Sequence, residues 1–181
     1  RLAALKALVA LGRDEAIGAL VDRIAHDDDA AGVAKPAAEM LALIPGDKPL
    51  SAAAAALTEA PAKSRVALLE LLTMRAARGE GEAVLKQASD ADPAVRAAAL
   101  KAMEKVARPQ DAQPLIELAI AAKDAGEATG AIKAAAAASL QSDDAQGRTA
   151  PWLAALKTAQ GVKRAAIERA AFGQQFRPRH A

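Results

Sequence analysis

A short motif near the start of the chain recurs in its second half. Residues 1–8 read RLAALKAL and residues 96–103 read RAAALKAM, so six of the eight positions are identical. The agreement extends downstream, because the apolar residue Leu20 corresponds to Leu115 in the same register. A pattern kept over this length covers two helices and the turn between them, and it predicts an architecture built from repeats.

Weaker copies of the motif fill the rest of the chain. The position of Leu5 recurs at intervals of 35, 29, 31, 37 and 30 residues, at Met40, Leu69, Leu100, Ala137 and Ile167. Two short helices with two turns require about this length. The sequence therefore predicts a stack of antiparallel helix pairs.

The composition agrees with an all-α fold. Alanine, the strongest helix former, occurs in five-residue runs at 52–56 and 134–138. Aromatic residues, which strands favour, make up 2% of the chain and comprise only Trp152, Phe172 and Phe176. We therefore expect helices with small side chains between them, which allow close packing.

Capping residues and prolines predict the helix boundaries. Asp92-Pro93 combines an N-cap with proline at the first helical position. Pro151 also marks a predicted helix start, whereas Pro36 lies inside a predicted helix and should kink it or delay its start. The predicted pairs are about 1–11 with 14–26, 30–44 with 48–59, 62–78 with 81–89, 92–107 with 111–123, and 126–141 with 149–159, followed by a last helix at 161–174.

The segments 92–103 and 112–118 resemble the first helix and the start of the second helix of a bacterial HEAT, or PBS-lyase-type, repeat. The resemblance implies a HEAT-like α-solenoid of about five helix pairs plus a terminal helix. It covers residues 1–174 as one domain and leaves 175–181 as a tail or linker. Because the chain opens inside the motif at Arg1, we expect a fragment of a longer protein.

The resemblance also implies a role for basic residues early in the first helices. In HEAT repeats such a residue commonly pairs with an acid in a neighbouring turn. The matching positions, which we call the basic ladder, are Arg65, Arg96, Lys133 and Lys163. A structural link between adjacent repeats is the favoured interpretation, and a row of cations for an anionic ligand is the alternative.

Charge is distributed unevenly along the chain. The net charge is +2, but the segment from Lys157 onward contains six cations and one acid, so the remainder carries −3. This basic end is compatible with weak nucleic-acid binding through phosphate contacts. A solvated last helix or a surface that faces another domain explains it equally well.

The sequence carries no motif for a metal, a cofactor or a nucleophile. The chain lacks cysteine, which excludes zinc–thiolate and disulfide sites. His26 precedes Asp27–Asp29, but consecutive residues cannot all face one ion, and His180 lies in the predicted tail. No phosphate-binding or Gly-x-Ser-x-Gly motif occurs. A site built from scattered carboxylates stays open as the catalytic, or enzyme-associated, alternative.

The leading hypothesis is a protein-binding or intramolecular scaffold module without catalysis of its own. The partner would be an unknown protein or a neighbouring domain of the same chain. Trp152 is either a core residue that fills space left by alanines or an exposed anchor for the partner. The candidate partner-binding residues are Trp152, Lys157, Lys163, Arg164 and Arg169.

No apolar stretch has the length of a membrane span. Family analogy allows a periplasmic or secreted location, and the sequence defines neither the compartment nor the oligomeric state.

Overall fold

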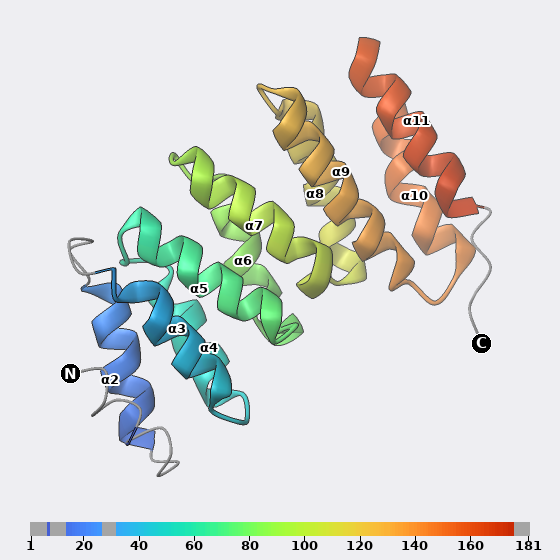
Figure 1. The fold of residues 1–181 in the computed structure, drawn as a ribbon. Coiled ribbons are helices and arrows are strands. Elements are labelled where there is room, and N and C mark those ends of the chain that lie inside the picture. Colours follow the sequence, from blue (N-terminus) through green and yellow to red (C-terminus); the bar gives the residue numbers. More distant parts are fainter. Residues whose placement is uncertain (1–6, 8–13, 27–31, 176–181) are drawn as a thin grey trace. The chain divides into compact units, whose positions relative to one another are not determined.

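A computed structural model describes residues 7, 14–26 and 32–175 of the chain. In this part the protein is all-α, with ten α-helices, two short 3₁₀ helices and no strand (Figure 1). Packing divides the chain into two compact units, Arg1–Ala102 and Met103–Ala181. The division falls inside one helix, and each unit is described by itself.

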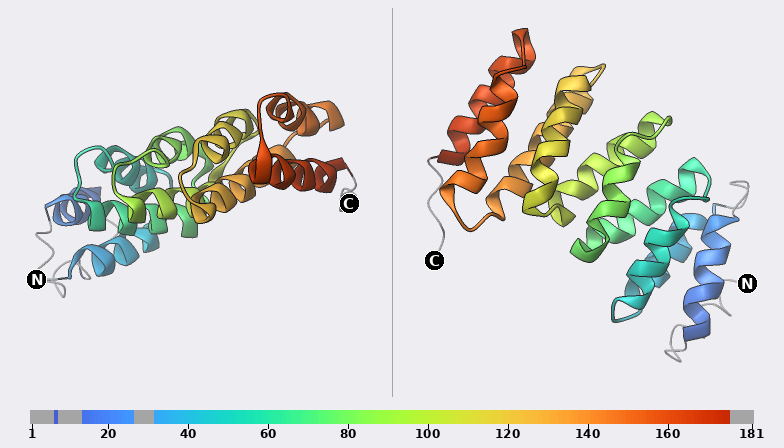
Figure 2. Two further views of the ribbon diagram at one scale, coloured as in Figure 1. Left: turned by 90° about the horizontal axis from the view of Figure 1, so that it is seen from above. Right: turned by 180° about the vertical axis from the view of Figure 1, so that it is seen from behind.

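The helices of unit 1 alternate between two layers (Figures 1 and 2). Helix α3 packs against α2 and α5, while α4 packs against α2, α5 and α6. One layer therefore contains α3 and α5, and the other contains α2, α4 and α6. The elements are α2 (Asp14–Ala25), α3 (Ala34–Leu43), α4 (Lys48–Ala56), α5 (Ala62–Met74), η1 (Arg78–Glu80), α6 (Gly81–Gln87) and the first part of α7 (Pro93–Val106).

Unit 2 has the same alternation. Helix α9 packs against α8 and α11, and α10 packs against α8 and α11. The elements are the end of α7, η2 (Pro109–Asp111), α8 (Ala112–Ala121), α9 (Ala125–Leu140), α10 (Ala145–Leu156) and α11 (Gly161–Gln175). In both units, contacts between successive helices are consistent with a solenoid.

The cores of the two units differ in composition. In unit 1, α5 buries four leucines, Leu68, Leu69, Leu71 and Leu72. In unit 2, α9 buries four alanines, Ala131, Ala134, Ala135 and Ala138. The large side chain beside them is Trp152 of α10, which is fully buried and whose Nε1–H donates to the Ser139 hydroxyl at 2.9 Å. The tryptophan thus fills space that the alanines leave empty.

The predicted helices agree with the observed ones. From 14–26 onward, each predicted helix has a counterpart, and every boundary agrees within four residues. The Asp92 cap is confirmed, because its Oδ1 accepts a hydrogen bond from the Ala94 amide at 2.8 Å. The predicted helix at 1–11 lies outside the described residues, apart from residue 7. The predicted tail at 175–181 begins one residue too early, because Gln175 still belongs to the last helix, and residues 176–181 lie outside the described part of the chain.

The two unusual prolines behave differently. Pro36 delays the helix start as predicted: α3 begins at Ala34, so the proline lies in the first turn, where the missing N–H costs nothing. The prediction that Pro151 marks a helix start is wrong. Helix α10 begins at Ala145, because the Asp144 side chain accepts from the Gly147 amide and caps the helix there, and Pro151 lies inside it.

Candidate interaction surfaces

A groove crosses three helices of unit 1. It has a volume of about 480 Å³ and is bounded by α3, α5 and the first part of α7. Its lining residues are Lys35, Ala38, Glu39, Ala67, Glu70, Thr73, Met74, Ala97, Ala98 and Lys101. A volume of this size lies within the range of about 300–1,000 Å³ that is typical of ligand pockets.

The floor of the groove consists of alanines that share one position in the repeat. Ala38, Ala67 and Ala98 each lie two residues before the position that corresponds to Leu5. Ala38 and Ala67 are buried. The repeat register therefore contained a signal for this surface, but only the packing of α3, α5 and α7 shows that the three alanines line the same groove.

Charged side chains form the rim of this alanine-floored groove. Lys35 and Glu39 project from α3, Glu70 from α5 and Lys101 from α7, and all four are exposed. Among the residues that the structure describes, none forms an ion pair or a hydrogen bond with these four side chains. At one margin Met74 is 61% exposed. The groove thus combines an apolar floor with charges that have no partner in the described structure.

A second groove of about 420 Å³ lies between α4, η1 and α6 in the same unit. Its polar groups are engaged. The Ser51 hydroxyl donates to Glu80 Oε1 at 2.7 Å, and Lys86 pairs with Glu82 at 3.0 Å. This surface offers fewer unsatisfied charges than the alanine-floored groove.

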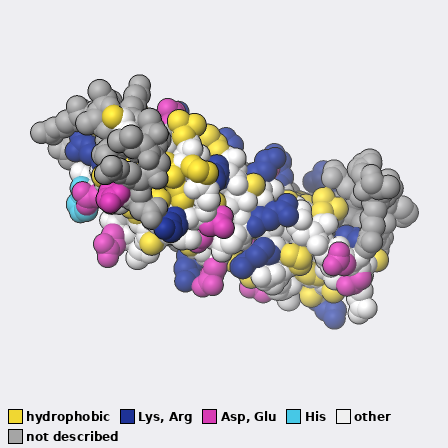
Figure 3. All heavy atoms as spheres, turned by 90° about the horizontal axis from the view of Figure 1, so that it is seen from below, with side chains coloured by type: hydrophobic (Ala, Val, Ile, Leu, Met, Phe, Trp, Pro, Cys, Tyr) yellow, Lys and Arg dark blue, Asp and Glu magenta, His cyan; other side chains and the backbone are white. Residues whose placement is uncertain are grey.

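Exposed apolar residues elsewhere are scattered. Seen from below, small apolar clusters alternate with cationic and anionic side chains (Figure 3). The large exposed apolar side chains among the described residues are Leu43, Met74, Leu140, Leu153 and Phe172. Single residues of this kind are normal on a protein surface.

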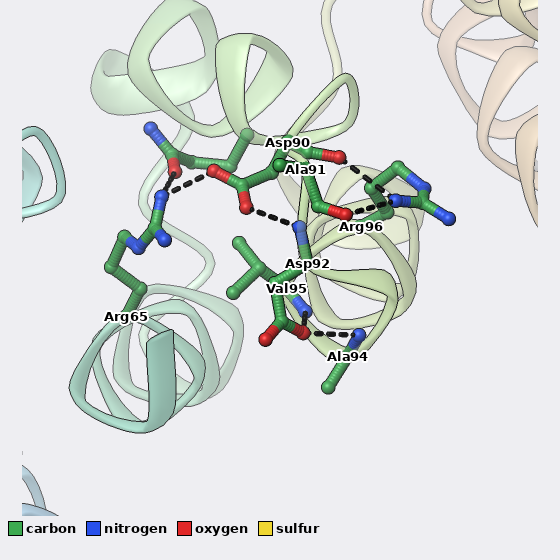
Figure 4. A network of polar contacts seen from close by, with 8 residues as sticks. Arg65, Asp90, Ala91, Asp92, Ala94, Val95 and Arg96 are labelled. Carbon is green, nitrogen blue, oxygen red and sulfur yellow. Dashed lines mark hydrogen bonds and ion pairs between the residues drawn. The ribbon is translucent and has the colours of Figure 1, made fainter. Parts of the chain in front are cut away.

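The basic ladder begins with a network around Arg65 of α5 (Figure 4). Its guanidinium donates to the Asp90 carboxylate and, at 3.5 Å, to Gln87 Oε1. Asp90 also accepts the Asp92 amide at 2.8 Å, and Asp92 caps α7. Arg65 therefore links α5 to the turn that precedes α7.

Two other ladder residues donate to backbone carbonyls, and one is exposed. Arg96 donates to the carbonyls of Asp90 and Ala91, both at 2.9 Å. Lys163 of α11 donates to the carbonyls of Ile120 and Ala122 at 2.6 and 2.7 Å. Lys133 is exposed on α9.

Arg75 has the same function as Lys163, in unit 1. From the end of α5 it donates to the carbonyls of Ala42 and Ile44, both at 2.8 Å, and of Gly46 at 3.2 Å. These groups terminate α3, just as Ile120 and Ala122 terminate α8. A cation at a helix C-terminus satisfies carbonyls that have no partner in the helix and interacts favourably with the helix dipole.

The candidate partner-binding residues are mostly engaged within unit 2. Trp152 is fully buried, which fits the core interpretation and leaves no exposed ring for a partner. Arg164 donates to the Leu156 carbonyl at 2.6 Å and to Glu168 at 3.0 Å. Arg169 Nε donates to the Ala165 carbonyl at 3.3 Å. Lys163 holds the end of α8, and Lys157 is exposed at the end of α10.

The histidine region shows ordinary helix-end contacts. His26 Nδ1 lies 2.9 Å from the Asp22 carbonyl oxygen and 3.1 Å from Asp22 Oδ1. Asp27–Asp29 and His180 lie outside the described residues. Within the described ranges, no three His, Cys, Asp or Glu side chains are grouped closely enough to hold a metal ion.

No helix in the described part of the chain is both long and apolar enough to cross a membrane. A scan against protein-family models finds no match to this chain, and a search of curated proteins finds none either.

Proposed function

We propose that this protein is a HEAT-like α-solenoid that binds a partner protein, or a neighbouring domain of its own chain, and performs no catalysis. The observation that carries the proposal is the alanine-floored groove of unit 1, whose rim charges have no partner among the described residues. Protein interfaces combine an apolar centre with a polar rim in this way. The repeated motif supports the solenoid, because stacked repeats present long surfaces to partners.

The two alternative functions have less support. For nucleic acid, a cluster of free cations would be required, but Lys163, Arg164 and Arg169 each donate to backbone carbonyls. For catalysis, a pair of carboxylates in a shared pocket would be required. Glu39 and Glu70 line one groove, but both side chains are exposed to solvent rather than enclosed in a pocket.

Affinity capture with the immobilised chain tests the proposal. The lysate of the source organism is applied at low and at moderate salt, and the retained material is analysed by mass spectrometry and stained for nucleic acid. We expect a specific protein to be retained at both salts, because apolar contact with a groove is weakly screened. The protein is then purified and titrated against the chain by calorimetry, which separates a direct partner from a passenger. Recovery of nucleic acid alone, lost as salt rises, would instead support the basic C-terminal end.

A further inference from the structure

We infer that the alanine-floored groove receives an amphipathic helix of the partner, with a basic side chain at the centre of its apolar face and an acidic side chain toward α7. The inference rests on the proposed function and names the site and the chemistry of the partner. It is argued from the shape of the groove and from the order of charges around it.

The groove favours a helix over an extended segment. Its walls are α3, α5 and α7, whose backbone groups are already bonded within the helices, and the described chain has no strand edge. An extended segment buried there would leave its own N–H and C=O groups without partners, whereas a helix satisfies them internally. The small side chains of Ala38, Ala67 and Ala98 let a helix axis approach closely.

The width of the groove sets the length of the segment. Three neighbouring helices at spacings of about 8–10 Å span about 16–20 Å between the outer two axes. A helix rises 1.5 Å per residue, so about 11–13 residues cross from α3 to α7. This corresponds to three or four turns, with apolar residues at i, i+3, i+4 and i+7 toward the alanines.

The rim charges determine which charged side chains the bound segment carries and where they lie. Glu39 of α3 and Glu70 of α5 place carboxylates over the first two helices, and Lys101 of α7 places an ammonium group over the third. Lys35, one turn before Glu39, adds a second ammonium group at the α3 margin. Since no described residue neutralises them, a bound segment that covered them would pay to desolvate them unless it supplied opposite charges. A central Lys or Arg facing Glu39 and Glu70, and a Glu or Asp facing Lys101, meets this requirement for these three groups. Met74 adds an adaptable apolar contact at the margin.

The experiment uses two labelled synthetic helical peptides of 16 residues, roughly the derived length plus flanking turns. Both have an Ala/Leu apolar face and a glutamate near one end. One carries a central lysine and the other a central glutamate. Fluorescence anisotropy should show that the full chain binds the lysine peptide about tenfold more tightly. The double variant E39K/E70K should reverse this preference.

A control variant separates local from general charge effects. E59K/E104K makes the same change in net charge at exposed glutamates that do not line the groove. It should keep the wild-type preference. All four positions are exposed, so the free energies of unfolding of both double variants should lie within about 0.5 kcal/mol of the wild-type value. Denaturation followed by circular dichroism checks this.

The outcomes distinguish this inference from the proposed function. Failure of the wild-type chain to bind either peptide, equal binding of both, or an unchanged preference in E39K/E70K overturns the inference. If E39K/E70K nevertheless retains the partner found by affinity capture, the proposed function survives and the partner binds elsewhere.

Discussion

The two units fill the space between their helices in different ways. Unit 1 uses several leucines of one helix, which together supply the apolar volume. Unit 2 lines the corresponding helix α9 with alanines, and Trp152 of α10 is the largest of its fully buried side chains. Protein interiors are close-packed, so both solutions must reach similar density. The comparison shows that the two units pack similar helix layers with different mixtures of large and small side chains.

The core of unit 2 should depend strongly on its largest residue, Trp152. We expect Trp152→Ala to lower the free energy of unfolding by about 3–5 kcal/mol, because the surrounding alanines cannot collapse into the space left by the indole. Urea denaturation followed by circular dichroism measures the loss, and hydrogen exchange should locate it in unit 2. The neighbouring change Leu153→Ala is the control. Leu153 is 52% exposed, so its replacement should cost no more than about 0.5 kcal/mol. A small loss for Trp152→Ala would show that the alanines form a core without it.

The core of unit 1 should respond less to the loss of any one side chain. Leu69→Ala should cost about 2–3 kcal/mol, toward the lower end for a buried leucine, because three leucines of the same helix remain to repack. Hydrogen exchange should place this loss in unit 1. If Leu69→Ala proves as costly as Trp152→Ala, the distinction between the two cores is wrong.

The sequence predicted the helices well because their signals are local. Asp92-Pro93 caps α7 through its own next residues, and such signals need no knowledge of the rest of the fold. Pro151 misled the prediction of α10 because a proline often marks a helix start, whereas the residue that caps this helix, Asp144, lies about two turns before it. The burial of Trp152 and its bond to Ser139 depend on how α9 and α10 meet, so the sequence left two interpretations open.

The surfaces were less predictable, for a physical reason. The sequence identifies the cations but not the helix ends that they contact. Every residue has a backbone carbonyl, so residue type does not show which carbonyl accepts the hydrogen bond. The resemblance therefore implied acidic partners for the basic ladder, whereas Lys163 donates to carbonyls. The groove of unit 1 depends on the adjacency of α3, α5 and α7, so its charged rim was not among the predicted site residues.

Each unit has one cation that donates to the carbonyls at the end of a helix, so the contribution of this contact to stability can be compared between the units. Arg75→Met in unit 1 and Lys163→Met in unit 2 each keep an apolar stem and remove the hydrogen bonds to the end of α3 or α8. Each should cost about 1.5–3 kcal/mol, the usual range for hydrogen bonds from charged groups. The arginine, with three acceptors, should be the more costly to lose. Lys157→Met serves as an exposed control. If Arg75→Met and Lys163→Met gave the same denaturation curve as this control, these contacts would add nothing to stability.

The smallest effect should come from backbone conformation, and its sign should differ between the units. Ala76 lies two residues after α5 and has a positive φ of 46°, and the amides of Ala76 and Ala77 donate to the carbonyls of Thr73 and Leu72. Gly161, at the start of α11, has φ of 58°. This conformation costs a residue with a Cβ about 1–2 kcal/mol, and glycine avoids that cost because it has no Cβ. Ala76→Gly should therefore stabilise unit 1 by up to about 1 kcal/mol after the entropy cost of glycine, and Gly161→Ala should destabilise unit 2 by a similar amount. Thermal melts of the two variants test this opposition, and a shift of both in the same direction would refute it.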